Sequence, residues 1–232
     1  MIDFDFTPFF YKYESLSGMA DAVFNKMCKE YESLVKCKNE CSDCCHALFD
    51  LTLVEAMYIN TRFNQTFSGK KRKALIEKAN RADRKTYRIK KEAYNEMRKG
   101  KNEVDILGMM ALEKVRCPLL NEEEKCDLYQ YRPITCRFYG IPTEINGMSH
   151  TCGKSDFKEG EKYPTVKLGV IQKQLYDISE EIVKALNTKY VKMADMLVPL
   201  SMAILTEYNE EYLGLAEPKE NSGKGDVDGN GK

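Results

Sequence analysis

Nine cysteines in a chain of 232 residues constrain the fold more than any other feature of the sequence. Eight of them lie in two separate segments, four in each, namely Cys37, Cys41, Cys44 and Cys45, then Cys117, Cys126, Cys136 and Cys152. Thiolates two or three residues apart in a turn can converge on one ion, because the loop backbone curls around it. The sequence therefore predicts a fold that brings two distant segments together around metal.

The chemistry of the thiols depends on the compartment. The first residues lack the basic and apolar stretches of a secretory signal, so we expect a cytoplasmic protein with reduced thiols that bind metal rather than form disulfides. Sulfur-only ligands suit zinc, iron–sulfur clusters and Cu(I), and do not suit magnesium or calcium. Eight thiols allow two four-thiolate sites, or one cluster with thiols to spare. Adjacent Cys44 and Cys45 are expected to diverge, which would send one of them to a second site or to a larger cluster.

Apolar periodicity predicts a mostly α protein. The predicted helices cover residues 12–36, 52–63, 68–99, 103–115, 164–187 and 192–213, and the first of these places Cys28 on an apolar face as a core residue. The string TLVE at 52–55 is a capping box. Residues 116–153 are rich in proline and glycine and predict loops with one short hairpin. No apolar stretch is long enough for a membrane span.

The predicted organisation is a single helical domain over 12–215, with an irregular, loop-rich cysteine insert over 37–152 that binds metal. An N-terminal arm covers 1–11, and a tail without apolar pattern covers 216–232 and is expected to be disordered.

Four further residues adjoin the cysteines. His46 and His150 are the only histidines, and either could bind metal through neutral imidazole, although eight thiols favour a supporting or exposed role. Arg132 and Arg137 flank Cys136. Their guanidinium groups could offset thiolate charge, or they could form ordinary surface ion pairs, and the sequence leaves both readings open.

Residues 70–101 carry 14 Lys and Arg against four Asp and Glu, although the whole chain is formally neutral. Such asymmetry can mark a surface for nucleic acid. The same stretch has an apolar stripe, so the charges are interpreted first as the solvated face of a long helix, and nucleic acid as the less favoured partner.

The cysteine strings together resemble the YkgJ-like cysteine-cluster family, the CxxCxxCC domain described as zinc- or iron-chelating. The resemblance rests on the first cluster, RCPLL at 116–120, CDLYQYRPITCRFYG at 126–140 and the late Cys152. It covers residues 37–152 and implies metal chelation by the eight cysteines. One departure is the three-residue gap between Cys37 and Cys41, where the family pattern has two. Flagellin lysine N-methylases, which are larger, carry a similar cluster.

These observations lead to a first hypothesis and two alternatives. The first is a metal-chelating or interaction module that holds zinc or a [4Fe–4S] cluster and contacts a protein partner. The resemblance alone implies the second, an iron–sulfur-dependent enzyme that transfers methyl groups to protein lysine from S-adenosylmethionine. The third is a nucleic-acid binder that uses residues 70–101. No catalytic residue is identified.

Overall fold

A computed structural model describes residues 2, 4–37, 41–145 and 147–215. The predicted disordered tail lies outside the described residues. The α-helices, which dominate the described chain as predicted, are α1 (Thr7–Glu30), α2 (Leu53–Thr66), α3 (Gly69–Arg98), α4 (Glu103–Leu112), α5 (Ile134–Phe138), α6 (Leu168–Leu186) and α7 (Leu200–Leu205). Three short 3-10 helices join them, η1 (Asp43–His46), η2 (Tyr129–Tyr131) and η3 (Met193–Asp195).

Two small sheets complete the fold. In the first, β1 (Asp50–Leu51) pairs antiparallel with β5 (Val198–Pro199). In the second, β2 (Thr143–Ile145) is central, antiparallel to β3 (Met148–His150) and parallel to β4 (Val166–Lys167). The β2–β3 pair is the hairpin predicted within the proline- and glycine-rich segment.

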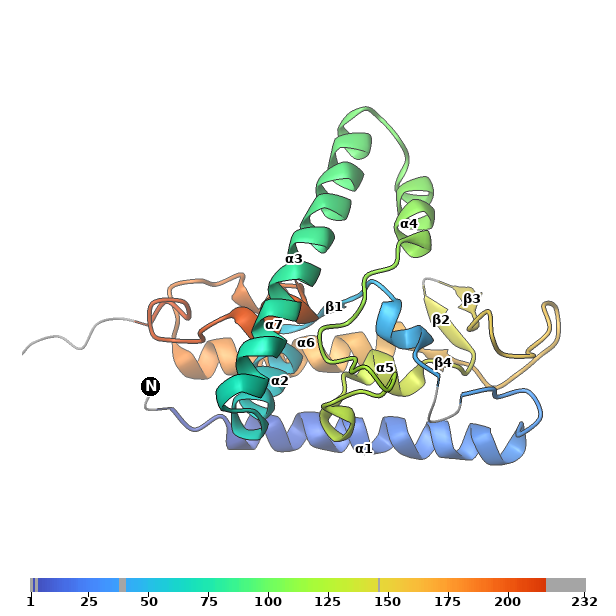
Figure 1. The fold of residues 1–232 in the computed structure, drawn as a ribbon, viewed down its shortest axis with the longest axis horizontal. Helices are drawn as coiled ribbons and strands as arrows, with labels where there is room; N and C mark the ends of the chain where they lie inside the picture. The colour runs from blue at the N-terminus through green and yellow to red at the C-terminus, as the bar shows by residue number, and fades with distance from the viewer. Residues whose placement is uncertain (1, 3, 38–40, 146, 216–232) are drawn as a thin grey trace, which may run out of the picture.

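The body of the molecule is built around α2, with the long helices α1 and α6 beside it (Figure 1). Its residues are buried from Leu53 to Ile59 without interruption, as expected for a helix enclosed on every side. The predicted capping box is present, because Thr52 accepts from the backbone of Glu55 while the Glu55 carboxylate accepts from the Thr52 N–H. This pair fixes where α2 begins.

Two predicted boundaries differ from the structure for local reasons. Helix α1 begins at Thr7, inside the segment expected to be an arm, because Pro8 fits the first turn of a helix, where no N–H is needed. The helix predicted over 192–213 is wrong. Pro199 lacks an N–H and holds Val198 extended, so the α-helix there is limited to Leu200–Leu205, preceded by the 3-10 turn η3.

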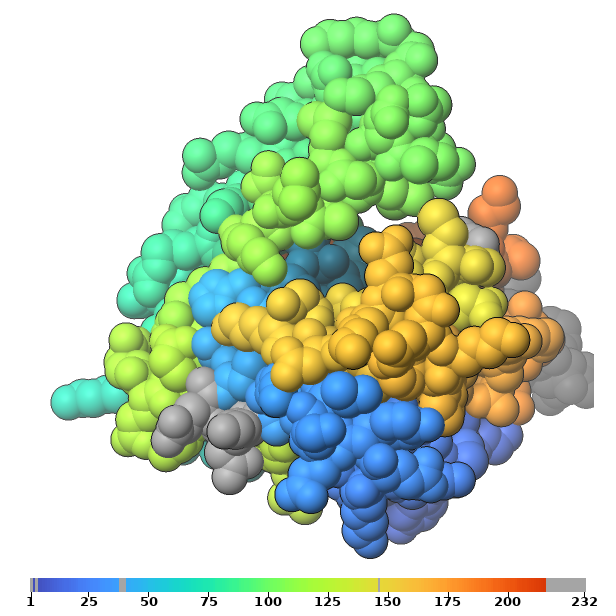
Figure 2. Space-filling view, turned by 90° about the vertical axis from the view of Figure 1, so that its right-hand side faces the viewer, coloured from blue at the N-terminus to red at the C-terminus, as the bar shows by residue number. Residues whose placement is uncertain are grey.

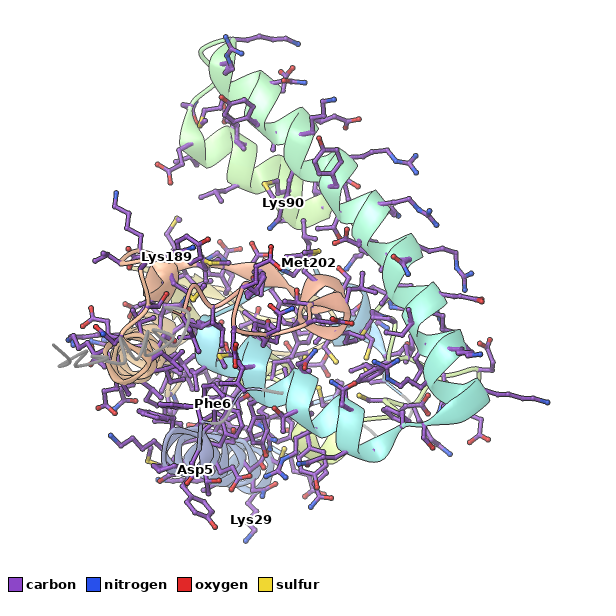
Figure 3. The ribbon with its side chains drawn as sticks, turned by 90° about the vertical axis from the view of Figure 1, so that its left-hand side faces the viewer. Asp5, Phe6, Lys29, Lys90, Lys189 and Met202 are labelled. Atoms are coloured by element: carbon purple, nitrogen blue, oxygen red, sulfur yellow. The ribbon has the colours of Figure 1, made fainter. Side chains whose placement is uncertain are left out.

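Helices α3 and α4 form an arm that projects from the body, with a hollow beneath α4 (Figures 1 and 2). At its base, α3 packs against α7, and Lys90 on its inward side pairs with Asp50 at 2.6 Å (Figure 3). A small separate apolar cluster of Ala82, Ile89 and Val115 lies there. Ile106 is the one buried residue of α4. Among the described helices, none combines the length and the apolar character that crossing a bilayer would need.

Candidate metal centre

A cavity of about 460 Å³ lies where the two cysteine segments meet. Seven of the eight predicted ligands line it, namely Cys37, Cys41, Cys44, Cys45, Cys117, Cys126 and Cys136. Apolar residues such as Leu48, Phe49 and Leu200 form one part of the remaining wall, Ala82 and Thr86 of α3 another, and charged residues of the second cysteine segment the rest. Cys152 is not part of the lining. The fold therefore gathers thiols from both segments around one space.

Backbone hydrogen bonds join the two segments directly. The Cys117 N–H donates to the Cys45 carbonyl at 2.7 Å, and the Val115 N–H donates to the His46 carbonyl at 3.0 Å. A second pairing, between Leu120 and Cys126, closes the next loop. These bonds hold Cys45, Cys117 and Cys126 in fixed register without any metal.

Helix α5 presents Cys136, and a buried carboxylate holds the start of that helix. The Ile134 N–H donates to Glu55 Oε1 at 3.2 Å, and Tyr13 also lies within reach of this oxygen at 3.5 Å. Burial raises the pKa of Glu55, although hydrogen bonds from Ile134 and Thr52 oppose the shift. The Glu55 carboxyl, which caps α2, thus also positions α5. The capping-box spacing in the sequence does not reveal this second role.

Two arginines share Asp21 of α1 but act differently. Arg137 is only 6% exposed, pairs with Asp21, and donates to the carbonyls of Gln130 and Arg132, so it holds the loop together. Arg132 donates to Asp21 at 3.0 Å and stacks on the Tyr129 ring at 4.1 Å. Its positive charge lowers the pKa of nearby thiols, among them Cys44 and Cys136. Arg132 therefore offsets thiolate charge, whereas the contacts of Arg137 mainly hold the loop.

The first cysteine group consists of Cys44, Cys45, Cys117, Cys126 and Cys136. The sulfurs of Cys44 and Cys45 lie 4.0 Å apart, which corrects the expectation that they diverge. Two thiolates on one tetrahedral zinc, each at about 2.3 Å, would be about 3.8 Å apart. A hydrogen bond from Cys45 lowers the pKa of Cys44 to about 7 against the opposing effect of burial, and this bond raises the pKa of Cys45.

The other three thiols of the first group are half-buried in the wall of the cavity. Burial raises the pKa of Cys117 to about 12 and raises the pKa of Cys126 and Cys136. The charge of Cys44 raises the pKa of all three further. Such mutual effects require short separations, and they mark thiols that would release protons only to a strong electrophile such as a metal ion.

The second cysteine group consists of Cys37, Cys41 and Cys152. Burial raises the pKa of Cys37 to about 12, and the charges of Cys41 and Cys152 add to this shift. The Cys37 thiol donates to the Tyr139 carbonyl at 3.3 Å and lies directly against Gly140. Cys152 lies 3.9 Å from Asp43, whose other hydrogen bond comes from the Tyr139 hydroxyl at 2.8 Å. Asp43 is therefore an oxygen neighbour of this group.

The two histidines and the ninth cysteine do not line the cavity. His46 Nδ1 contacts the Ser42 carbonyl at 3.1 Å, and His150 is exposed on β3. Cys28 is half-buried on α1 rather than fully in the core. Its charge still contributes to the raised pKa of Cys37, so it lies beside the second group.

The donor set fits a thiophilic metal, but the thiols do not yet form a closed site. Among the residues described, no three Cys, His, Asp or Glu side chains converge closely enough to hold one ion as they stand. A bound metal would have to draw neighbouring thiols inward across the cavity. The lining combines seven thiols with apolar side chains, four cationic side chains and a single carboxylate, Glu124, and this sulfur-rich donor set suits zinc or iron rather than magnesium or calcium.

Three residues that shape the centre, Asp21, Asp43 and Gly140, were not among the predicted site residues. Asp21 lies in an amphipathic helix, and no neighbouring motif marks it as functional. Asp43 lies between cysteines, but no pattern in the sequence assigns it a role. Gly140 carried the clearest signal, since a glycine just after the YRPITCRFY string indicates a tight turn. Its φ of 102° and the adjacent Cys37 sulfur explain why glycine is needed there.

Comparison with known proteins agrees with this chemistry. No curated protein and no solved structure matches the chain. A family described as "CxxCxxCC: Putative zinc- or iron-chelating domain" matches residues 36–153, which include all eight clustered cysteines and slightly more than half of the chain. The chain therefore belongs to the CxxCxxCC family of zinc- or iron-chelating domains.

Proposed function

We propose that the protein chelates zinc or iron through its eight clustered cysteines, as a cytoplasmic YkgJ-type metal-binding module. The observation that carries this proposal is the cavity lined by seven of these cysteines, drawn from two segments that the backbone joins by hydrogen bonds. The pKa shifts support it, because the charge of Cys44 in the first segment raises the pKa of Cys117 and Cys136 in the second, which requires that these sulfurs lie close together.

The thiols are proposed to act as the two groups defined above. The first group offers five sulfurs within one cavity, enough for a four-thiolate site with one to spare. The second group offers three sulfurs and needs a fourth ligand. That ligand would be Asp43, or the one sulfur of Cys44 and Cys45 that the first site does not use. Two zinc ions per chain, or one iron–sulfur cluster with a neighbouring ion, would satisfy this arrangement.

The test is metal content in protein purified without oxygen, with visible absorption and iron, sulfide and zinc measured per chain. Broad absorption near 400 nm with about four iron and four sulfide is expected for a [4Fe–4S] cluster. A colourless protein with about two zinc is expected for two thiolate sites. The double variant Cys117→Ser, Cys136→Ser should lose metal from the first group, whereas Cys28→Ser should keep all of it. Metal content unaffected by the double variant would refute the proposal.

Iron–sulfur-dependent methyl transfer is a second candidate, because the cavity has an apolar wall and room beyond that needed for one ion. The discriminating experiment is equilibrium dialysis of metal-loaded protein against labelled S-adenosylmethionine. Saturable binding that disappears in the Cys117→Ser, Cys136→Ser variant would favour the enzyme. Absence of binding would leave the metal-binding module.

A further inference from the structure

A stripe of positive charge runs along the outer face of α3. Seven cations share this stripe at successive intervals of three, four, seven or eight residues, namely Lys70, Lys73, Arg81, Arg84, Arg88, Lys91 and Arg98. All are exposed. The buried residues of α3, such as Leu75, Ala79 and Thr86, fall on the opposite side of the helix at 100° per residue. Most of the stripe therefore faces away from the body, although Arg81 also lines a shallow pocket with Arg116 and Cys117.

These seven charges are not neutralised by neighbours. Other cations of the same helix are paired, Lys71 with Asp127, Lys78 with Glu122 and Lys90 with Asp50. Within the described part of the chain, no carboxylate forms an ion pair with any member of the stripe. Two exposed acidic residues accompany the seven cations, Glu77 in line with the stripe and Glu92 at its edge one turn after Arg88. Surface cations that only solubilise a helix are usually interspersed with acids, so this segregation indicates a polyanionic partner.

The arm presents the stripe without obstruction. A 30-residue helix is about 45 Å long, and the C-terminal end of α3, beyond the Lys90–Asp50 pair, projects from the body. Nitrogen-tipped side chains extend from its outer edge into open space (Figure 3). Two exposed tyrosines, Tyr87 at 63% and Tyr94 at 55%, lie one heptad apart beside the cations. Their hydroxyls can donate to phosphate oxygens, which lysines and arginines also bind.

The composition of the stripe favours nucleic acid over other polyanions. It contains no Leu, Ile, Val or Phe, which a helix needs to insert into an anionic membrane surface. Centres of protein interfaces are depleted of charge, whereas nucleic-acid interfaces are strongly positive. A straight convex helix also suits the outside or groove of a duplex better than a single strand, which is usually held in a concave channel.

We propose that the outer face of α3 binds the phosphate backbone of a nucleic-acid duplex without sequence preference. The proposal is independent of the metal centre, since none of the seven stripe cations lines the cysteine cavity, which α3 reaches through Ala82 and Thr86. Seven phosphate contacts would give a slope of log K against log salt of about −6, at about 0.9 per contact.

The test is fluorescence anisotropy of the full-length, metal-loaded protein with labelled 20-base-pair DNA and RNA duplexes. Binding should be detectable at 50 mM salt and should weaken about 1000-fold or more at 200 mM. The variant Arg84→Gln, Arg88→Gln should bind more weakly and lower the slope by about 2. The matched control Lys29→Gln, Lys192→Gln removes the same charge at exposed sites off the arm and should bind like the wild type.

Several results would overturn the proposal. One is that neither duplex binds at 50 mM salt. Another is that the control variant loses as much affinity for duplex as the arm variant. A third is tighter binding to a single strand, to poly-glutamate or to phosphatidylglycerol vesicles than to duplex. Retained metal content and circular dichroism in both variants would show that any lost binding does not come from unfolding.

Discussion

At the scale of single residues, Gly140 is the position where backbone conformation and the cysteine centre depend on each other most directly. Its φ is 102°, and a Cβ built on it would lie 2.3 Å from the Cys37 sulfur. A side chain there would strain the backbone and push Cys37 out of the cavity at once. Glycine is therefore needed both for the turn and for the thiol that packs against it.

We predict that Gly140→Ala lowers the free energy of unfolding by about 1–3 kcal/mol and reduces metal content. The matched control is Gly160→Ala, where φ is 81° but nothing lies within 4 Å of the added Cβ. The control should lose unfolding free energy because of its positive φ, but it should keep its normal metal content. Denaturant unfolding and metal analysis of both variants measure the difference, and equal metal content in the two would contradict the role given to the Cys37 contact.

Asp21 is the second residue with a long-range role, because its carboxylate forms ion pairs with both Arg132 and Arg137. We predict that Asp21→Asn costs about 1–3 kcal/mol of unfolding free energy, since it leaves the buried Arg137 with weaker partners. Asp177→Asn, which breaks an exposed pair with Lys173 on α6, should cost less than about 1 kcal/mol. Thermal unfolding of the two variants provides the comparison, and similar losses would show that the Asp21 cluster adds little.

At the scale of elements, one carboxyl couples α2 to α5. Burial raises the pKa of Glu55, so the folded state favours its protonated form. Stability from this group is therefore full below about pH 4.5, its ordinary value, and is lost as pH rises through the higher folded pKa. The hydrogen bond to Ile134 is retained in either form, because one oxygen remains an acceptor.

Glu55→Gln should therefore gain stability relative to the wild type as pH rises from 4 to 8. The glutamine amide cannot ionise, so the folded variant carries no buried charge at high pH. The measurement is denaturant unfolding in reductant and chelator, so that thiol–metal equilibria do not contribute. Glu207→Gln, at an exposed carboxylate, serves as the reference. A stability difference between Glu55→Gln and wild type that stays constant with pH would contradict this assignment.

The sequence predicted elements well where the signal was local. Apolar periodicity located α2, α3 and α6 to within a few residues, and the TLVE string located the start of α2. It failed where one residue changes the backbone, as Pro199 does in the region predicted to be a long helix. The cavity cysteines were predicted from their spacing. Their supports, Asp21 and Glu55, were not, because each acts across more than 75 residues of chain.

At the scale of the whole molecule, the body and the arm differ in how they are held. The main core encloses α2 and includes Leu75 and Ala79 of α3, whereas the rest of the arm relies on the small cluster of Ala82, Ile89 and Val115 and on one buried residue of α4. Little apolar surface is buried beyond Ile89. The upper arm should therefore open locally much more often than the body.

Hydrogen–deuterium exchange should show this difference directly. Amides of residues 90–112 are expected to exchange at least tenfold faster than those of α2 and α6, with or without metal. Mass spectrometry of peptides from the full-length protein resolves these regions. Protection of 90–112 as strong as that of α2 would show that the arm has a packing partner, such as a second copy of the chain, and concentration dependence would identify it.

The division of the cavity cysteines between two segments also has a consequence for synthesis. Cys45 leaves the ribosome 107 residues ahead of Cys152, which at about 5–20 residues per second is a delay of about 5–20 s. During that time the nascent chain exposes four reduced thiols whose partners do not yet exist. Metal loading is thus a late event in the life of this chain, and the early thiols must be kept from oxidation and from the wrong ion until the second segment emerges.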